Sequence, residues 1–199
     1  MARAAALGAA RETAVLRQVH GRRVALFRAG GEAFPARSLE GDGAATDRAG
    51  LVLAIRVADC LPVFLADREG RAAALLHAGW RGLAAGIVEE GLAALARLGA
   101  APERLVAWIG PSVGPCCYEV GGEVIRAFRG AARTINGGEE KPRLDLYETA
   151  RAILLRAGVD PERIDRRPPC TACAPHRFHS HRAHPEKGGR NLALLFLDR

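Results

Sequence analysis

Three short apolar runs between residues 51 and 76 constrain the fold more than any other feature of the sequence. Residues 51–57 and 63–66 are rich in aliphatic and β-branched side chains and predict strands, and residues 72–76 form a third run. Only a few residues separate each run from the next, whereas a parallel pair needs a crossover of a dozen or more residues. The sequence therefore predicts mixed rather than purely parallel strand pairing.

Helices are expected where apolar residues recur at helical spacing. Residues 83–98 have that spacing and are followed by Gly99, a residue type common at helix C-termini. Residues 146–156 form a second segment of this kind, with Asp145 and Glu148 as an N-terminal capping pair. A shorter helix is expected over residues 122–128. Together these elements predict an α/β fold with mixed β-sheets, in a single domain spanning residues 1–199.

Other strands and loops complete this outline. Residues 14–19 and 22–27 are β-prone runs separated by His20-Gly21, which predicts a hairpin or sharp turn with His20 at the bend. Two more strands are expected at residues 105–109 and 191–197. Segments rich in Gly, Pro and polar residues predict loops at residues 30–50, 110–117 and 130–142.

The composition excludes several classes of protein. Hydrophobic residues make up 49% of the chain and charged residues 26%, as in ordinary globular domains and unlike disordered chains. No apolar run approaches the roughly 18 residues of a membrane-spanning helix. The N-terminal residues carry arginine but no continuous hydrophobic stretch of signal-peptide length. Five cysteines, an odd number, do not describe an extracellular disulfide framework, so we expect a cytoplasmic protein.

The positive charge suggests small anionic substrates rather than nucleic acid. The formal net charge is +7, carried mostly by arginine, which pairs well with phosphate. The arginines are scattered singly along the chain, and aromatic residues are only 5%, too few for a platform on which bases stack. We therefore expect no nucleic-acid partner and no membrane partner.

Two histidines and a cysteine occupy similar places in the predicted strands. His20, Cys60 and His77 each end or interrupt an apolar run beside Gly or Pro, positions that lie at the rim of a sheet. Two His and one Cys form a legitimate three-ligand zinc set with a fourth position open to water or substrate. A buried free thiol with two hydrogen-bonded histidines would give the same pattern.

The same residues also fit a cysteine hydrolase. In that alternative Cys60 is the nucleophile, His77 is its base, and Asp59 or another carboxylate orients the imidazole. A non-catalytic module that binds a metal or a partner is a third possibility. The residues alone leave these alternatives open.

The C-terminal segment contains a second group of potential ligands. Cys170 and Cys173 form a C-x-x-C pair, and four histidines follow within residues 176–184. A structural zinc or a thiol redox pair is possible. Prolines flank the pair, whereas redox cysteines usually begin a helix. We expect a polar loop whose histidines face solvent or substrate, and therefore expect Cys170→Ala and Cys173→Ala to leave the zinc content mostly intact.

Five motifs, in order along nearly the whole chain, resemble those of the laccase-domain proteins. They are Gln18-Val19-His20-Gly21, Ala58-Asp59-Cys60-Leu61-Pro62, His77-Ala78-Gly79-Trp80-Arg81-Gly82, residues 109–121 and Gly189-Arg190. This family was formerly called multicopper polyphenol oxidoreductases and is now associated with zinc-dependent purine nucleoside phosphorylase activity. The resemblance implies an α/β/β/α-type sandwich with zinc held by His20, Cys60 and His77.

The resemblance also implies a reaction and a set of substrate contacts. The reaction is phosphorolysis of adenosine, inosine, guanosine and 5′-methylthioadenosine to free base and ribose 1-phosphate, with adenosine deamination as a second activity. Charge and motif position make Arg81, Arg182 and Arg190 the candidates for phosphate. We expect Tyr118 to stack on the base, Glu119 to contact the sugar and Asp59 to orient a ligand imidazole.

Two departures from the family's pattern, and its older name, bear on these expectations. His181 stands where the family commonly has a tyrosine, and Cys116 and Cys117 lie at positions that vary in the family. A multicopper oxidase needs several copper centres and more histidine ligands than the six in this chain. A single copper ion in the zinc position remains possible, because Cu(II) binds most nitrogen sites more tightly than Zn(II).

Overall fold

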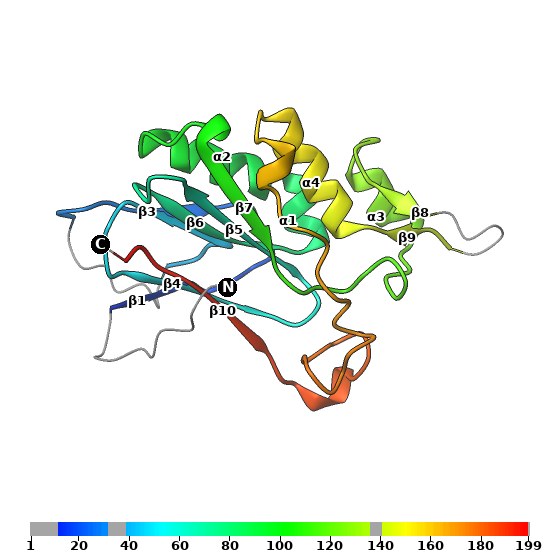
Figure 1. Cartoon of the computed structure of the whole chain (residues 1–199). Coiled ribbons are helices and arrows are strands. Elements are labelled where there is room, and N and C mark those ends of the chain that lie inside the picture. The colour runs from blue at the N-terminus through cyan, green and yellow to red at the C-terminus, as the bar shows by residue number, and fades with distance from the viewer. Residues whose placement is uncertain (1–11, 32–38, 136–140, 199) are drawn as a thin grey trace.

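Two main β-sheets, a small two-stranded sheet and one layer of helices build the described part of the molecule in the computed structural model, which describes residues 12–31, 39–135 and 141–198 (Figure 1). The larger sheet has the order β2-β3-β6-β5-β7, with strands Val24–Phe27, Gly43–Thr46, Ala73–Ala78, Leu61–Asp67 and Leu105–Ile109. The smaller sheet has the order β1-β4-β10, with strands Thr13–Val15, Val52–Val57 and Asn191–Leu195. A two-stranded sheet pairs β8 with β9, at Thr134–Ile135 and Arg143–Leu144.

The α-helices of the described residues lie together over the larger sheet, opposite the smaller one (Figure 1). They are α1 (Trp80–Ala85), α2 (Ile87–Arg97), α3 (Gly122–Ala127) and α4 (Leu146–Arg156). Short 3-10 turns occur at η2 (Pro102–Arg104), η3 (Pro161–Arg163) and η4 (Pro185–Lys187). The layers therefore run helices, larger sheet, smaller sheet, and none of the described helices is long and apolar enough to cross a membrane.

Strand pairing is mixed, as the short connections predicted. Strand β6 pairs antiparallel with both β3 and β5, and β5 pairs antiparallel with β7. The pairs β2–β3 and β1–β4 are parallel, and β10 joins β4 in antiparallel register. The expectation of an α/β fold with mixed sheets is confirmed.

Strand β6 explains why its sequence is apolar without alternation. All six of its residues are buried. Leu76 faces the core between the helices and the larger sheet, whereas Leu75 belongs to the core between the two sheets. Because successive side chains point to opposite faces and both faces are covered, every position must be apolar. His77 is the exception in this strand.

Of the two alternatives predicted around His20, a hairpin or a sharp turn, the structure has the turn and not the hairpin. Strands β1 and β2 belong to different sheets, and each pairs in parallel with a strand from later in the chain. The segment between them crosses from one sheet to the other. The β-prone sequence of two neighbouring runs does not indicate which strands they pair with. The bend at His20 is present, with a φ of 61°.

Two other boundaries differ from the sequence prediction. The helix expected over residues 83–98 is two helices, since Gly86 adopts a φ of 97° and ends α1 before α2 begins. The expected loop at residues 30–50 contains β3, and that at 130–142 contains β8. Residues 32–38 and 136–140 of those loops, and the N-terminal residues 1–11, lie outside the described residues. Helix α4 begins as expected, with the Asp145 side chain accepting from the Glu148 backbone N–H at 3.0 Å.

Candidate metal centre

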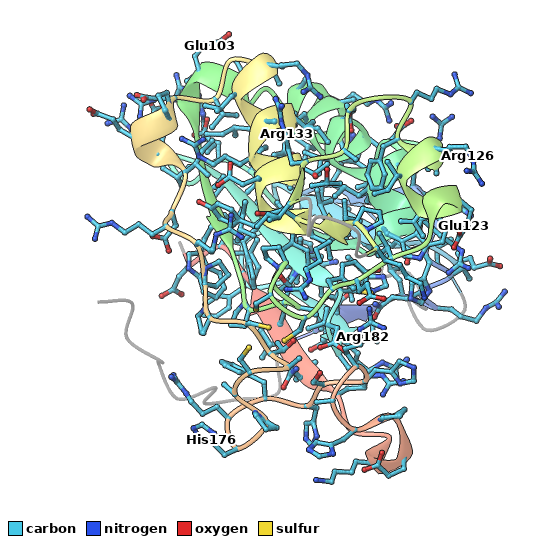
Figure 2. The ribbon with its side chains drawn as sticks, turned by 90° about the vertical axis from the view of Figure 1, so that its right-hand side faces the viewer. Glu103, Glu123, Arg126, Arg133, His176 and Arg182 are labelled. Carbon is cyan, nitrogen blue, oxygen red and sulfur yellow. The ribbon has the colours of Figure 1, made fainter. Side chains whose placement is uncertain are left out.

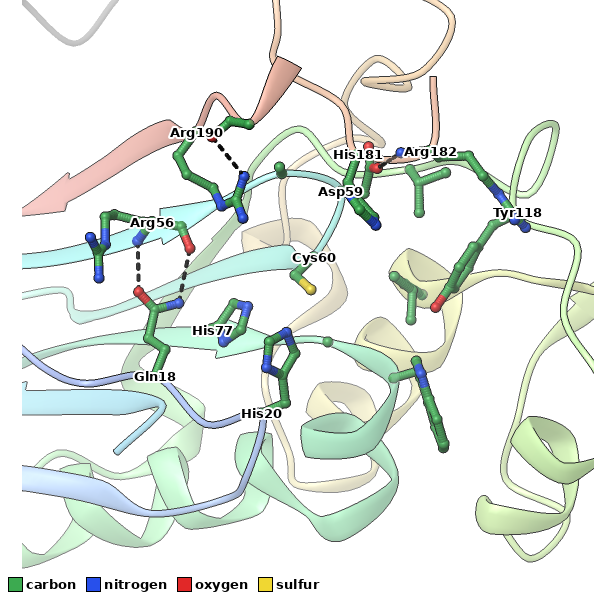
Figure 3. Close-up of a pocket in the computed structure, with 16 residues that line it drawn as sticks. Gln18, His20, Arg56, Asp59, Cys60, His77, Tyr118, His181, Arg182 and Arg190 are labelled. Atoms are coloured by element: carbon green, nitrogen blue, oxygen red, sulfur yellow. Dashed lines mark hydrogen bonds between the residues drawn. The ribbon is translucent and has the colours of Figure 1, made fainter. Parts of the chain in front are cut away.

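A cavity of about 710 Å³ opens at the rim of the sheets, and we call it the central cavity (Figure 3). This volume suits a small-molecule ligand. Its walls come from segments far apart in the sequence: Gln18, His20, Arg56, Ala58, Asp59, Cys60, His77, Gly79, Trp80, Val113, Tyr118, Leu146, His181, Arg182, Gly188 and Arg190.

His20, Cys60 and His77 meet in this cavity, and their side chains point toward one another in Figure 3. One potential ligand atom from each residue lies within 4.8 Å of the others. Cys60 directly precedes β5, and His77 lies in the neighbouring strand β6, opposite Pro62. His20 reaches them from the bend between the two sheets.

Gly79 makes room for this group. A Cβ atom at position 79 would lie 3.0 Å from the Cys60 Sγ and 3.2 Å from the His20 Cδ2. Any larger residue would push one of these side chains away. The glycine of the third motif is therefore required by the packing of His20 and Cys60, not by its own backbone, which is extended at a φ of −69°.

Asp42 holds the two histidines in place. Its carboxylate contacts the His77 Nδ1 at 2.8 Å and accepts the backbone N–H groups of His20 and Gly21 at 2.8 and 2.7 Å. Asp42 is fully buried. Because Nδ1 of His77 is engaged, Nε2 is the nitrogen left for a metal.

The role predicted for Asp59 falls to Asp42. The Asp59 carboxylate instead accepts the hydroxyl of Thr171 at 2.5 Å and the backbone N–H of Arg182 at 2.6 Å. Asp59 adopts a φ of 82°, an uncommon conformation for a residue with a side chain. Asp59 thus connects the C-terminal segment to the turn that carries Cys60. Nothing in the sequence indicates this connection.

The Cys60 thiol and the neighbouring imidazoles shift one another's pKa values. Burial, the largest influence, raises the pKa of the Cys60 thiol, but hydrogen bonds and charge from His20 and His77 outweigh it and lower that pKa to about 7. Burial likewise lowers the pKa of His77, whereas Asp42 and Cys60 together raise it to about 9. The group therefore favours a thiolate, the form in which cysteine binds a metal or acts as a nucleophile.

The donor set fits a metal ion. Two imidazoles and one thiolate that converge on one point, with an anchored second nitrogen on His77, are the ligands of three-residue zinc sites. They face an open cavity, so a fourth position is accessible to substrate. The chain thus has a group that could hold a metal ion.

The predicted substrate contacts divide into two sets. Tyr118, Arg182 and Arg190 line the central cavity, whereas Arg81 and Glu119 are not among its lining residues. The guanidinium of Arg81 lies 4.4 Å from the ring centroid of Trp80. The carboxylate of Glu119 lies 3.7 Å from the Lys141 Nζ. Glu119 therefore faces a lysine outside the cavity rather than the space expected for a sugar.

The arginines of the cavity differ in their existing partners. The Arg182 Nε donates to the carbonyl of Cys117 at 3.0 Å, and its Nη2 donates to the carbonyl of Glu119. Arg190 uses one nitrogen, Nη1, for the carbonyls of Gly188 and Gly189 at 3.1 and 2.8 Å. Arg182 therefore braces the loop that carries Tyr118, and Arg190 keeps more of its donors for a ligand.

Several residues in or behind the cavity wall were not given a role by the sequence. Gln18 exchanges two hydrogen bonds with the backbone of Arg56, each of 2.9 Å, and joins the first motif to β4. Trp80, which lies in the third motif, is half-buried and lines the cavity. Asp42 stands between two glycines in a segment expected to be a loop, and that short Gly-Asp-Gly sequence was the only local signal for it.

The histidines of the C-terminal segment are not all together: His179, His181 and His184 line one small cavity, whereas His176 does not. His181 lines the central cavity, and His184 lies 3.3 Å from the Glu186 carboxylate. His176 is exposed at the outer end of the segment (Figure 2). The cysteines of this segment behave differently, because Cys170 and Cys173 lie beside Cys116 and Cys117. The sequence prediction had treated the two cysteine pairs separately.

Comparison with known proteins identifies the relatives of this chain. "Purine nucleoside phosphorylase" of Xylella fastidiosa (strain Temecula1) is 42% identical over 192 residues, 92% of this chain and 71% of that protein. "Purine nucleoside phosphorylase YfiH" of Escherichia coli K12 is 39% identical over 187 residues, 92% of this chain and 72% of the relative. "Adenosine deaminase RL5" of an unknown prokaryotic organism is 34% identical over 191 residues, 90% of this chain and 73% of the relative.

Solved structures agree with these relatives. YlmD from Geobacillus stearothermophilus superposes with a TM-score of 0.86 at 32% identity, covering 95% of this chain and 74% of the other. The Bacillus licheniformis hypothetical protein YfiH superposes with a TM-score of 0.85 at 33% identity, covering 94% of this chain and 74% of the other. The family model described as "Multi-copper polyphenol oxidoreductase laccase" matches residues 1–198. The chain belongs to this family.

Proposed function

We propose that this chain is a zinc-dependent purine nucleoside phosphorylase. It would convert adenosine, inosine, guanosine or 5′-methylthioadenosine with phosphate to the free base and ribose 1-phosphate, and deaminate adenosine as a second activity. The observation that carries the proposal is the convergence of His20, Cys60 and His77 in a cavity that also holds cationic side chains. Relatives named for both activities support it.

The charge of the cavity suits phosphate. Arg56, Arg182 and Arg190 are among the lining residues, and the single lining carboxylate, Asp59, is already hydrogen-bonded to Thr171 and Arg182. An anion entering this part of the described structure would meet arginine donors rather than a free carboxylate. Arg190 is our first choice for phosphate because Arg182 is committed to two carbonyls.

Phosphorolysis breaks the bond between the sugar anomeric carbon and the purine nitrogen, and a phosphate oxygen forms the new bond to that carbon. The departing base needs a hydrogen-bond donor. The hydroxyl of Tyr118 can donate, because a tyrosine is protonated at neutral pH and burial raises the pKa of this one further, to about 12. Its ring, beside the Arg182 guanidinium at 5.6 Å from the ring centroid, also offers a face for the base.

Zinc bound by His20, Cys60 and His77 would supply a Lewis acid next to the substrate. Asp42 would keep His77 oriented, and Gly79 would keep space for Cys60 and His20. A cytoplasmic location belongs to the same proposal, because a cysteine ligand must stay a reduced thiol and all five cysteines are free. We likewise propose that residues 1–199 act as one domain.

The test is product analysis with metal-quantified protein. Adenosine is incubated with and without phosphate, and ribose 1-phosphate, free ribose, adenine and inosine are separated. The proposal expects ribose 1-phosphate only with phosphate, and loss of activity together with the zinc of this group in His20→Ala, Cys60→Ala and His77→Ala, with the fold intact. Release of free ribose at the same rate without phosphate would make the enzyme a hydrolase.

A cysteine hydrolase remains the alternative, supported by the proximity of the Cys60 thiol to the His77 imidazole. Despite burial, each group stabilises the charged form of the other, which lowers the pKa of Cys60 and raises that of His77 and so favours a thiolate–imidazolium pair. Such an enzyme would turn over at full rate after complete metal removal and would be inactivated by thiol alkylation. A zinc enzyme would lose activity on metal removal and recover it on adding zinc.

A further inference from the structure

The four cysteines outside the central cavity form a second group of soft metal ligands. Cys116 and Cys117 come from the loop after β7, and Cys170 and Cys173 come from the C-terminal segment, more than fifty positions later. Their Sγ atoms all lie within 4.8 Å of one another. In Figure 2 sulfur atoms, in yellow, gather where the green loop meets the orange C-terminal segment, to one side of Arg182.

The thiols are arranged around a common centre rather than in two pairs. The Sγ of Cys173 lies 3.5 Å from that of Cys116 and 3.4 Å from that of Cys117. A disulfide could join Cys173 to only one of them. In a tetrahedral zinc site with Zn–S bonds of about 2.3 Å, neighbouring sulfurs are about 3.8 Å apart. The four thiols are therefore close to the spacing that one ion would impose.

The backbone around the group is fitted to its sulfurs. The N–H of Gly114 donates to the Sγ of Cys170 at 3.1 Å, a hydrogen bond that stabilises negative charge on sulfur. A Cβ at position 114 would lie 3.1 Å from the Cys170 Cβ and 3.2 Å from the Cys116 Sγ. The two segments are also joined directly, since the N–H of Thr171 donates to the carbonyl of Ser112 at 2.9 Å.

We propose that Cys116, Cys117, Cys170 and Cys173 bind a second zinc ion, in a closed structural site separate from the His20, Cys60 and His77 group. Four S–H bonds break, four Zn–S bonds form and four protons pass to solvent, with no oxidation or reduction. Thiolates in tetrahedral geometry are the ligands of structural zinc. This proposal replaces the expectation that Cys170 and Cys173 belong to a polar loop without metal, and it does not rest on the proposed enzymatic function.

The position of the site suggests what it would stabilise. The segment from residue 166 to residue 184 has no α-helix or named strand, and backbone hydrogen bonds such as those from Ala174 to Thr171 and from His184 to Ser180 lie within the segment itself. Thr171, between two of the cysteines, donates its hydroxyl to Asp59, and the carbonyl of Cys117 accepts from Arg182. An ion binding both loops would thereby fix one wall of the central cavity.

The test is metal content measured on the full chain, with the fifth cysteine as a matched control. Wild type, purified with reductant and loaded with zinc, should hold about two zinc ions per chain. Cys173→Ser, at an exposed position, should hold about one, and so should Cys60→Ser, which removes a thiol from the other group. X-ray absorption at the zinc edge should then report four sulfur ligands and no nitrogen in Cys60→Ser, and mixed nitrogen and sulfur ligands in Cys173→Ser.

Three results would overturn the proposal. The first is a wild-type protein that holds only one zinc after loading, with that zinc retained in Cys173→Ser and lost in Cys60→Ser. The second is a nitrogen-containing zinc environment in Cys60→Ser. The third is a disulfide between any two of the four cysteines in freshly purified protein, detected by mass spectrometry of its peptides. If Cys173→Ser does not fold, the proposal is tested by the number of zinc ions per wild-type chain and by the zinc ligands in Cys60→Ser.

Discussion

Replacement of Asp42 by asparagine should weaken metal binding at the His20, Cys60 and His77 group more than any other single change outside the ligands. Asparagine has the same shape, but it carries no charge and its amide nitrogen must replace one oxygen. The carboxylate oxygens of Asp42 accept from the His77 imidazole and the backbone of His20 at 2.8 Å, and from the backbone of Gly21 at 2.7 Å. In Asp42→Asn a donor would therefore face a donor in a fully buried position.

The expected magnitude follows from these contacts. A hydrogen bond to a charged group contributes about 1.5–3 kcal/mol to stability, and a neutral one about 0.5–1.5 kcal/mol. Loss of one bond and weakening of the others gives about 3–5 kcal/mol of lost unfolding free energy. Residues that orient a metal-bound imidazole typically change metal affinity about tenfold to a hundredfold when replaced. Zinc affinity of Asp42→Asn should fall within that range.

Asp67→Asn is the matched control. Asp67 is also buried and accepts several hydrogen bonds, from Arg71, Arg104 and the backbone of Glu69. It lies at the end of β5 that is remote from Cys60, roughly 20 Å away along the strand. Its replacement should lower the unfolding free energy without changing zinc affinity.

Both variants are compared by urea unfolding and by competition for zinc with a chromophoric chelator. The titrations use a Cys173→Ser background, so that only the group held by Asp42 is measured. Equal zinc affinity in wild type and Asp42→Asn would refute the positioning role of Asp42. Equal loss of affinity in Asp42→Asn and Asp67→Asn would mean that global stability, and not orientation, controls metal binding.

Three further outcomes are expected. In the proposed phosphorylase, Arg190→Ala should raise the phosphate concentration for half-maximal rate about tenfold to a hundredfold without loss of zinc, as measured by phosphate titration at saturating nucleoside. Arg182→Ala should also weaken nucleoside binding. Burial raises the pKa of Asp67, but hydrogen bonds from two arginines and a backbone N–H outweigh burial and lower that pKa below its usual value of 3.8. The ionised Asp67 therefore stabilises the fold fully above pH 3.8, and this stabilisation is lost as the pH falls through the lowered pKa. The difference in unfolding free energy between wild type and Asp67→Asn should therefore shrink below about pH 4; a constant difference would exclude a charge effect. Gly91→Ala should lower the free energy of unfolding by about 1–3 kcal/mol, although alanine favours a helix, because the new Cβ would lie 2.5 Å from the Leu76 Cδ1. In a Leu76→Ala background the same change should be neutral or stabilising, and a double-mutant cycle measures the difference.

The sequence by itself determined the elements whose signals are local. The buried strands β4, β5 and β6 follow from largely apolar runs, and α4 begins directly after Asp145 because the cap is formed by residues three positions apart. Mixed pairing follows from connections too short for crossovers. The sequence also singled out His20, Cys60 and His77, because each stands at a break in an apolar run.

Only the tertiary structure decided which distant residues meet. Asp42 lies in a segment without hydrophobic periodicity, so nothing local could link it to His77, 35 positions away. The Asp59 carboxylate accepts hydrogen bonds from Thr171 and Arg182 rather than from an imidazole, and both of these partners lie more than a hundred positions later in the chain. Glu119, one position after Tyr118, faces Lys141 outside the cavity.

The four cysteines make the same point most directly. Each pair could be read from the sequence, as Cys116-Cys117 and as Cys170-x-x-Cys173, and each pair alone offers too few ligands for a closed zinc site. The two loops are brought together by the packing of the sheets and by the hydrogen bond from Thr171 to Ser112. Ligand type is a property of the sequence, but ligand number depends on contacts between residues far apart in the chain, and folding alone sets those contacts.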